Sequence, residues 1–375
     1  MAAGRSETFM SKKNRLRRAA SADAAGLGLN SPPAAAFRFP PRLVFAALLA
    51  WFFVVCWNYF PLHPEVAHLC GRGFPDFSFT AALAGFLGVL GSNALNLLFL
   101  SLFIVLAYGM GLGFLSFFDI AVSVMERFIF ALGLGFGAIA YIMLLLGAVG
   151  ALHKSIILPA FLLGSFVSAF KIRIWAFRAE SLKSEIGEIL KLSPAWKTLV
   201  FLGMLFSLLN IVMAFTPEMF YDSLVYQLSV PNYYLLKHQI LPMRFLSHSN
   251  FPLNLSMIYM LALSLNNEIL AKMIHCLTGL LTVLLIYFSV KRIYNAKTAL
   301  FSALIFCSAP IFVANSWTCG NDVGLTFFFA LAYVAYLGWL RTGGTGQFIL
   351  FSVFAGISRA FLSIFLAPAN VCDWK

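Results

Sequence analysis

The sequence predicts an all-α protein that crosses a membrane many times. Hydrophobic residues make up 61% of its 375 residues and charged residues only 11%, a composition far from that of soluble domains. The apolar residues also gather in runs of about 20, the length that a helix needs to cross a bilayer. We expect about nine spans, near residues 43–60, 94–118, 127–150, 153–170, 198–215, 268–290, 298–315, 323–341 and 347–367.

Residues 1–42 form a basic segment ahead of the first apolar run. Lysines and arginines in this segment greatly outnumber its two acids, Glu7 and Asp23. A basic segment directly before a hydrophobic span is typical of a cytoplasmic topogenic signal rather than of a nucleic-acid-binding arm. We therefore expect a disordered cytoplasmic tail, an integral multi-pass membrane protein and no nucleic-acid partner.

The other basic segments fix the direction of the spans. Residues 171–197, 291–297 and 341–344 carry Lys and Arg next to apolar runs, so we expect all three on the cytoplasmic side, with 171–197 as an amphipathic surface helix. An even number of spans must then separate the tail from 171–197. The short, Gly-rich stretch 79–91 is accordingly predicted to be interfacial or re-entrant.

This arrangement puts Asp222 and Asp322 together on the non-cytoplasmic face. Asp222 lies in a polar external segment, 216–255. A helix beginning in 218–230 would gather Asp222, Tyr226, Ser229 and Tyr233 on one face and bury Leu224, Val225 and Leu228 on the other. Pro231 is a position where such a helix breaks or kinks.

A group of cations follows in the same external segment, formed by Lys237, His238, Arg244 and His248. Cations at the membrane surface suit a phosphate or a lipid headgroup, although ordinary interfacial anchoring is the alternative. Asn250 is either a hydrogen-bonding partner of a sugar or phosphate or a turn residue before a proline.

Several other polar residues and small-residue motifs have a structural explanation. Asn321 or Asp322 is a good N-cap for the helix that follows, which is compatible with a role in the site. Glu218 and Glu268 are expected to be solvated or interfacial. The glycines of GLGFG, residues 133–137, are expected to pack helices rather than to bind a nucleotide. The six cysteines show no metal-ligand spacing.

The order of four sequence blocks carries a resemblance to a known family. PEMFYDSLVYQLSVPNYYLLKHQI is followed by SNFPLNLSMIYMLALSL, then by AKMIHCLTGLLTVLLIYFSVKRIYNAKTALFSALIFCSAP and by CGNDVGLTFFFALAYVAYLGWL. This order resembles membrane glycosyltransferases of the type C fold, and in particular glycosyltransferase family 39, over about residues 198–367. Ser223 stands where the mannosyltransferases of the family have a second acidic residue, and Gln227 stands where a histidine is expected.

The resemblance implies a reaction and a set of site residues. It implies transfer of a sugar from a polyprenyl-phosphate donor to a saccharide, lipid or protein acceptor on the non-cytoplasmic face, in a bacterial inner membrane. It implies catalytic roles for Asp222 and Asp322. Asp222 would act as a general base or position a divalent metal, and whether a metal cofactor takes part is left open. The candidate substrate-binding residues are Tyr221, Tyr226, Gln227, Lys237, His238, Arg244, His248 and Asn250.

The expected organisation has three parts. The tail, 1–42, precedes a membrane extension of about four spans and an amphipathic segment, 43–197, and then a glycosyltransferase-like core, 198–375, which we expect to be incomplete because relatives continue through further spans. Two alternatives stay open: a transporter or flippase for a lipid-linked saccharide, and a truncated inactive remnant.

Overall fold

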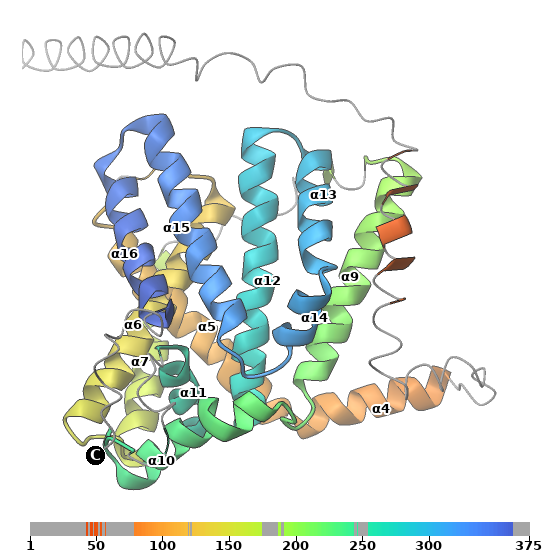
Figure 1. Ribbon diagram of the computed structural model, residues 1–375. Helices are drawn as coiled ribbons and strands as arrows, with labels where there is room; N and C mark the ends of the chain where they lie inside the picture. Colours follow the sequence, from red (N-terminus) through yellow and green to blue (C-terminus); the bar gives the residue numbers. More distant parts are fainter. Residues whose placement is uncertain are drawn as a thin grey trace, which may run out of the picture.

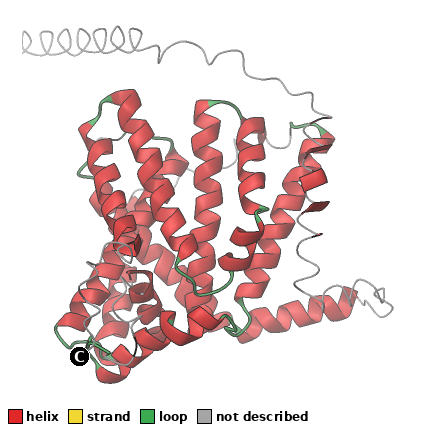
Figure 2. Ribbon diagram, in the orientation of Figure 1, coloured by secondary structure: helices red, strands yellow, loops and turns green. Residues whose placement is uncertain are grey.

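A computed structural model describes residues 79–118, 122–174, 191–243 and 254–362, with isolated positions elsewhere, some of them between 43 and 57. Within these ranges every regular element is a helix (Figure 2). The elements are α4 (Phe79–Ser92), α5 (Ala94–Leu115), α6 (Val124–Ala148), α7 (Lys154–Ile174), α9 (Pro194–Ala214), the π-helical turn η1 (Ser223–Gln227), α10 (Ser229–Lys237), α11 (Asn254–Leu265), α12 (Glu268–Ile293), α13 (Ala296–Cys307), α14 (Pro310–Ser316), α15 (Asp322–Thr342) and α16 (Thr345–Leu362).

Six of the described helices are long and apolar enough to cross a membrane, namely α5, α6, α7, α9, α12 and α15. Helices α13 and α14 together would make a seventh span, but they meet at an angle of 67°. The predicted span 298–315 is therefore broken. The break falls at Pro310, the first residue of α14, because proline cannot donate the hydrogen bond that would continue α13.

The remaining span predictions fall at the two ends of the chain. Helix α16 forms the described part of the predicted span 347–367, whereas the tail and most of the predicted span 43–60 lie outside the described residues. The segment 79–91 forms the separate 14-residue helix α4. Figure 1 shows α4 extending across one end of the bundle rather than alongside the long helices, as expected for an interfacial piece.

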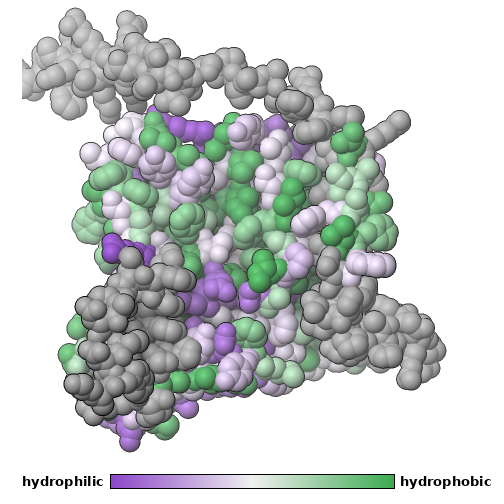
Figure 3. Space-filling view, in the orientation of Figure 1, coloured by the Kyte–Doolittle hydropathy of each residue, from purple (hydrophilic) through white to green (hydrophobic). Residues whose placement is uncertain are grey.

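The long helices place the loops at two opposite ends of the bundle (Figure 1). The turns that join α12 to α13 and α15 to α16 lie at the upper end in this view, together with the start of α9. The segment from α9 to α10 and the turn before α15 lie at the lower end. The described basic turns, 291–297 and 341–344, are thus at the end opposite to the acid-bearing segments, and Figure 3 shows many apolar residues on the visible face of the long helices between them.

Helix α6 lies at the centre of one continuous core. Buried residues of α5, α6, α7, α11, α12, α15 and α16 belong to the same hydrophobic cluster. Phe136 of α6 packs on Phe103 of α5 and on Phe327 of α15. The N-terminal helices and the C-terminal helices therefore share their packing.

The glycines of α5 and α6 allow an unusually close approach of the two helices. A Cβ atom on Gly135 would lie 1.9 Å from the carbonyl oxygen of Ala107, and one on Gly111 would lie 1.7 Å from that of Ala131. No side chain fits at these distances, so the glycines are needed for contact between the backbones. This confirms that the GLGFG motif packs helices.

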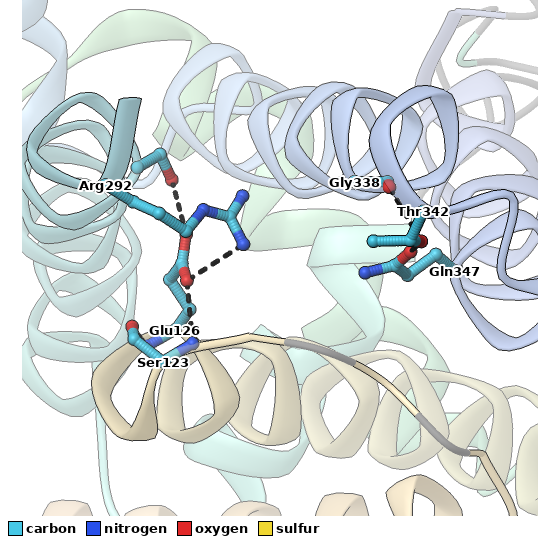
Figure 4. Close-up of polar contacts among 7 residues, drawn as sticks. Ser123, Glu126, Arg292, Gly338, Thr342 and Gln347 are labelled. Atoms are coloured by element: carbon cyan, nitrogen blue, oxygen red, sulfur yellow. Dashed lines mark hydrogen bonds and ion pairs between the residues drawn. The ribbon is translucent and has the colours of Figure 1, made fainter. Parts of the chain in front are cut away.

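An ion pair joins α6 to α12 at the upper end of the bundle (Figure 4). Glu126 is fully buried, and its Oε2 lies 3.2 Å from Nη1 of Arg292 and accepts a hydrogen bond from the Ser123 N–H at 2.9 Å. Ser289 donates to the other carboxylate oxygen at 3.3 Å. The pair thus fixes the start of α6 against the end of α12.

Candidate functional site

The segment after α9 forms a helical turn that continues into α10. Residues 221–222 are helical, η1 follows, and the Leu228 N–H donates to the Ser223 carbonyl at 2.9 Å, the wider spacing of a π-turn. Pro231 then falls in the first turn of α10, where its missing N–H leaves no helical bond unmade. The helix therefore continues through Pro231, and the local irregularity is the π-turn that ends shortly before it.

The π-turn also changes which side chains are buried. Leu228 is buried as predicted, but Leu224 is 49% exposed, so its predicted burial is wrong. The extra residue in the wide turn rotates the chain relative to a regular α-helix. Single π-turns are frequent at functional sites in other proteins.

The Tyr226 phenol lies within electrostatic range of both predicted catalytic acids. Burial raises the pKa of the Tyr226 phenol, and the charge of Asp222, a hydrogen bond to Asp222 and the charge of Asp322 raise it further, whereas a hydrogen bond from Gln227 opposes them. Asp222 and Asp322 come from segments far apart in the sequence. The fold brings both within electrostatic range of one hydroxyl group.

Gln227 connects this site to the core. Its side chain is buried, and its Oε1 accepts a hydrogen bond from the Ser256 hydroxyl of α11. The residue next to Tyr226 is thus tied to α11 by a side-chain hydrogen bond. Tyr221, by contrast, is 74% exposed.

Two of the cations predicted to join this site, Lys237 and His238, are at the far end of α10, about 20 Å along the helical segment from Asp222 at about 1.5 Å per residue. Lys237 lies over the ring of Tyr233, and His238 stacks on His153 with ring centroids 4.0 Å apart. The described contacts of these two cations are with aromatic rings, and their grouping with Asp222 stays a prediction.

The other predicted site residues have different outcomes. Arg244, His248 and Asn250 lie outside the described residues. Asp322 is exposed and is the first residue of α15, and Asn321 precedes the helix without a side-chain capping bond. The helix start is confirmed and the side-chain cap is not.

Glu218 belongs to a buried polar network that the sequence analysis missed. It is only 7% exposed, so its predicted solvation is wrong. Its Oε1 accepts from the N–H groups of Met219 and Phe220 at 2.9 and 3.0 Å, and its Oε2 accepts from the N–H of Cys319 at 2.6 Å. One carboxylate therefore joins the segment before Asp222 to the turn before Asp322.

Lys272 of α12 holds the same two segments from the core side. Its ammonium is fully buried and donates to the carbonyl oxygens of Thr216 and Pro217 at 2.8 and 3.1 Å. It also lies 5.5 Å from the ring centroid of Trp317, a cation–π arrangement. A lysine inside an apolar span was the available sequence signal, because such residues are costly in a membrane and generally have a specific partner.

Tyr259 and His275 hold the turn before α15. The Tyr259 hydroxyl donates to the Gly320 carbonyl at 2.6 Å and lies 2.6 Å from Nδ1 of His275. The other ring nitrogen of His275 lies 3.1 Å from the carbonyl oxygen of Asn315. These contacts fix the turn on the core before it reaches Asp322.

The surroundings of Cys319 show how strongly this region is desolvated. Burial raises the pKa of the Cys319 thiol well above its usual range, and the neighbouring Glu218 carboxylate acts in the same direction, while Lys272 opposes them. The thiol is therefore protonated and unreactive at neutral pH.

Three polar side-chain atoms near the two acids are buried without a hydrogen-bond partner. They are Oγ of Ser223, Nδ2 of Asn254 and Oδ1 of Asn321. Buried polar groups are usually paired, so these atoms are available to a polar molecule in this part of the bundle. The described residues contain no group of three His, Cys, Asp or Glu side chains that could hold a metal ion.

The architecture defines an integral membrane protein of helical-bundle type, with two acid-bearing segments at one end of the bundle. Residues 252–369 match the family model of dolichyl-phosphate-mannose-protein mannosyltransferases. The matched segment, from α11 to α16, is thus similar to a family of glycosyltransferases, and it includes Asp322. Comparisons with curated proteins and with solved structures gave no match.

Proposed function

We propose that the protein transfers a sugar from a polyprenyl-phosphate donor to an acceptor hydroxyl at the lower end of the bundle in Figure 1. The observation that carries this proposal is that the segments bearing Asp222 and Asp322 lie at one end of the bundle and that both acids act electrostatically on Tyr226, next to a segment that matches a glycosyltransferase family. The description of that family names a lipid-phosphate sugar as the donor, and the membrane location of the site suits a lipid-linked substrate.

The proposed reaction needs one proton transfer and the release of one leaving group at this site. The acceptor oxygen forms a bond to the anomeric carbon of the sugar, and the bond from that carbon to the phosphate oxygen breaks. The Asp222 carboxylate takes the acceptor proton, and the polyprenyl phosphate leaves with the electron pair of the broken bond. General-base assistance of this kind typically contributes about 100- to 10,000-fold.

Asp222 is oriented for this role by Tyr226. A hydroxyl that donates to one carboxylate oxygen fixes the side chain and leaves the other oxygen free to accept the substrate proton. Asp322 adds a second carboxylate that acts electrostatically on the same phenol. Two carboxylates suit a divalent cation such as Mg²⁺, which proteins typically hold through one or two carboxylates plus the phosphates of a substrate, so the same two residues would hold a metal if the reaction uses one.

The same proposal sets the orientation in the membrane. The basic segments lie at the end opposite to the two acids, and positively charged loops remain in the cytoplasm. The N-terminus would then be cytoplasmic and the site non-cytoplasmic, which in a bacterium means the outer face of the inner membrane.

The test is the discharge of labelled polyprenyl-phosphate sugars by membranes that contain the unmodified chain, its Asp222→Asn variant, or neither. We expect one donor to lose its label only with the unmodified chain, while the variant inserts into the membrane to the same level. Equal discharge by Asp222→Asn would remove Asp222 from the mechanism. No discharge of any donor by inserted protein would refute the proposed function and favour a transporter, which flux assays in vesicles would then address.

A further inference from the structure

Glu218 occupies the junction between the two segments that carry the acids. Through one oxygen it accepts from two N–H groups of its own turn, and through the other it accepts from the N–H of Cys319. Asp222 follows a few residues after Glu218, and Asp322 follows a few residues after Cys319. Such short connections leave little freedom between the carboxylate and either acid.

We propose that Glu218 is a positioning residue that sets the relative placement of Asp222 and Asp322, an inference that rests on the proposed transfer reaction. The carboxylate acts as a bridge between the two segments and does not touch the substrate. A displacement of reacting groups by about 1 Å can reduce turnover by about 100-fold. The distance between the two acids is therefore a quantity on which the rate depends steeply.

The surroundings of Glu218 support a positioning role over simple solvation. A carboxylate buried to this extent is costly unless hydrogen bonds and an opposite charge compensate it. Three backbone N–H groups supply the hydrogen bonds. The Lys272 ammonium supplies the opposite charge, since both it and Glu218 act electrostatically on the Cys319 thiol. Lys272 also holds the two residues just before Glu218 by their carbonyl oxygens, so the bridge is anchored in α12.

The bridge makes a prediction that a local role of Glu218 does not. The variant Glu218→Asp keeps the charge and can still accept from the N–H groups of its own turn, but its side chain is one methylene too short to reach Cys319. Glu218→Gln keeps the length of the side chain, but its amide N–H₂ group faces one set of backbone N–H donors and cannot accept from them. Loss of the negative charge also weakens the hydrogen bonds from the other set. The matched control is Glu268→Gln, which neutralises the other glutamate of this region in the first turn of α12.

The first readout is hydrogen–deuterium exchange of the full chain in detergent or nanodiscs, measured by mass spectrometry on peptides covering 216–224 and 315–322. We expect Glu218→Asp to speed exchange mainly in 315–322, and Glu218→Gln to speed it in both peptides. Exchange in α6 should stay unchanged, and Glu268→Gln should behave like the unmodified chain. Unchanged exchange of 315–322 in both Glu218 variants would overturn the bridge.

The second readout is the steady-state kinetics of sugar transfer by the same variants. Both Glu218 variants should lower kcat by about 10- to 100-fold with the donor KM unchanged within about twofold, because the misplaced groups act on the reaction rather than on donor binding. The retained charge of Glu218→Asp should give no rescue. An unchanged kcat despite faster exchange would overturn the positioning role. An inactive unmodified chain would refute the proposed function and the positioning role with it. In that case the exchange data alone would decide whether Glu218 bridges the two segments.

Discussion

The adjacent residues Lys291 and Arg292 provide a sharp test of how the bundle is held together. Each forms an ion pair, Lys291 with Glu188 at 2.8 Å and Arg292 with Glu126 at 3.2 Å. The two pairs differ in burial, because the Glu188 side chain is 47% exposed and that of Glu126 is fully buried. Replacing each cation by glutamine makes the same change of charge at neighbouring positions.

The expected costs follow from that difference. Removing one partner of a buried pair typically costs about 3–5 kcal/mol, because the other charge is left without compensation. Glu126 would still accept from the Ser123 N–H and the Ser289 hydroxyl, so we expect the lower end, about 3 kcal/mol, for Arg292→Gln. Removing Lys291 leaves a half-exposed carboxylate that water solvates, so the expected cost of Lys291→Gln is near that of a surface pair, about 0–1 kcal/mol.

The assay is equilibrium unfolding in mixed micelles, with increasing SDS and tryptophan fluorescence as the signal. Arg292→Gln should shift the midpoint strongly and Lys291→Gln only slightly. The double variant Glu126→Gln, Arg292→Gln should recover part of the loss, since it removes the uncompensated carboxylate. Equal shifts for the two single variants would refute the argument from burial.

Three further predictions concern the site and the core. Tyr226→Phe should lower transfer by about 10-fold, because loss of one hydrogen bond in a buried site costs roughly 1–2 kcal/mol, and donor turnover measures it. The pKa of Tyr226 is raised above 10.0 in the folded chain. Any stability from its neutral hydroxyl is therefore fully present below about pH 10 and is lost as the pH rises through the folded-state pKa. A difference in unfolding midpoint between the unmodified chain and Tyr226→Phe that changes between pH 6 and 9 would contradict this. Gly135→Ala should destabilise the protein by about 1–3 kcal/mol or more, because the new methyl group meets a backbone carbonyl of α5, whereas Gly113→Ala, which has nothing within 4 Å, should be nearly neutral in the same SDS titration. Maleimide at about pH 8 should leave Cys319 unlabelled in the folded protein and label it after denaturation, since its thiol is buried and its pKa is raised.

The sequence predicted the long helices and the common face of the two acids for a clear physical reason. A bilayer forces each span to be long, apolar and opposite in direction to its neighbour. Counting spans was therefore enough to put Asp222 and Asp322 at one end. The same logic missed α11, a buried 12-residue helix, because it is too short to cross a membrane.

Side-chain contacts between distant segments could not be predicted in this way. Glu218 was expected in solvent because nothing near it in the sequence indicates the Cys319 N–H that it binds. Lys237 was grouped with Asp222 because both belong to one polar external segment, whereas the helical segment η1–α10 runs through Pro231 and separates the two residues along its length. In both cases a tertiary contact or a local helix irregularity, which a local pattern does not encode, sets the position of the side chain.

The two ends of the helical segment η1–α10 are held by different parts of the chain. At its start, Gln227 is bonded to Ser256 of α11, within the part that matches the glycosyltransferase family. At its end, the N–H of Leu152, in the turn between α6 and α7, donates to the His238 carbonyl, and Nδ1 of His238 lies 3.1 Å from the Leu152 carbonyl oxygen. The Ile240 N–H donates to the Gly147 carbonyl in the last turn of α6. Because Asp222 begins this segment, its position depends on the N-terminal helices as well as on the matched ones. We therefore infer that α6 and α7 belong to the scaffold of the site, and that shortening the turn between them would displace the end of α10 before it affected the family-matched helices.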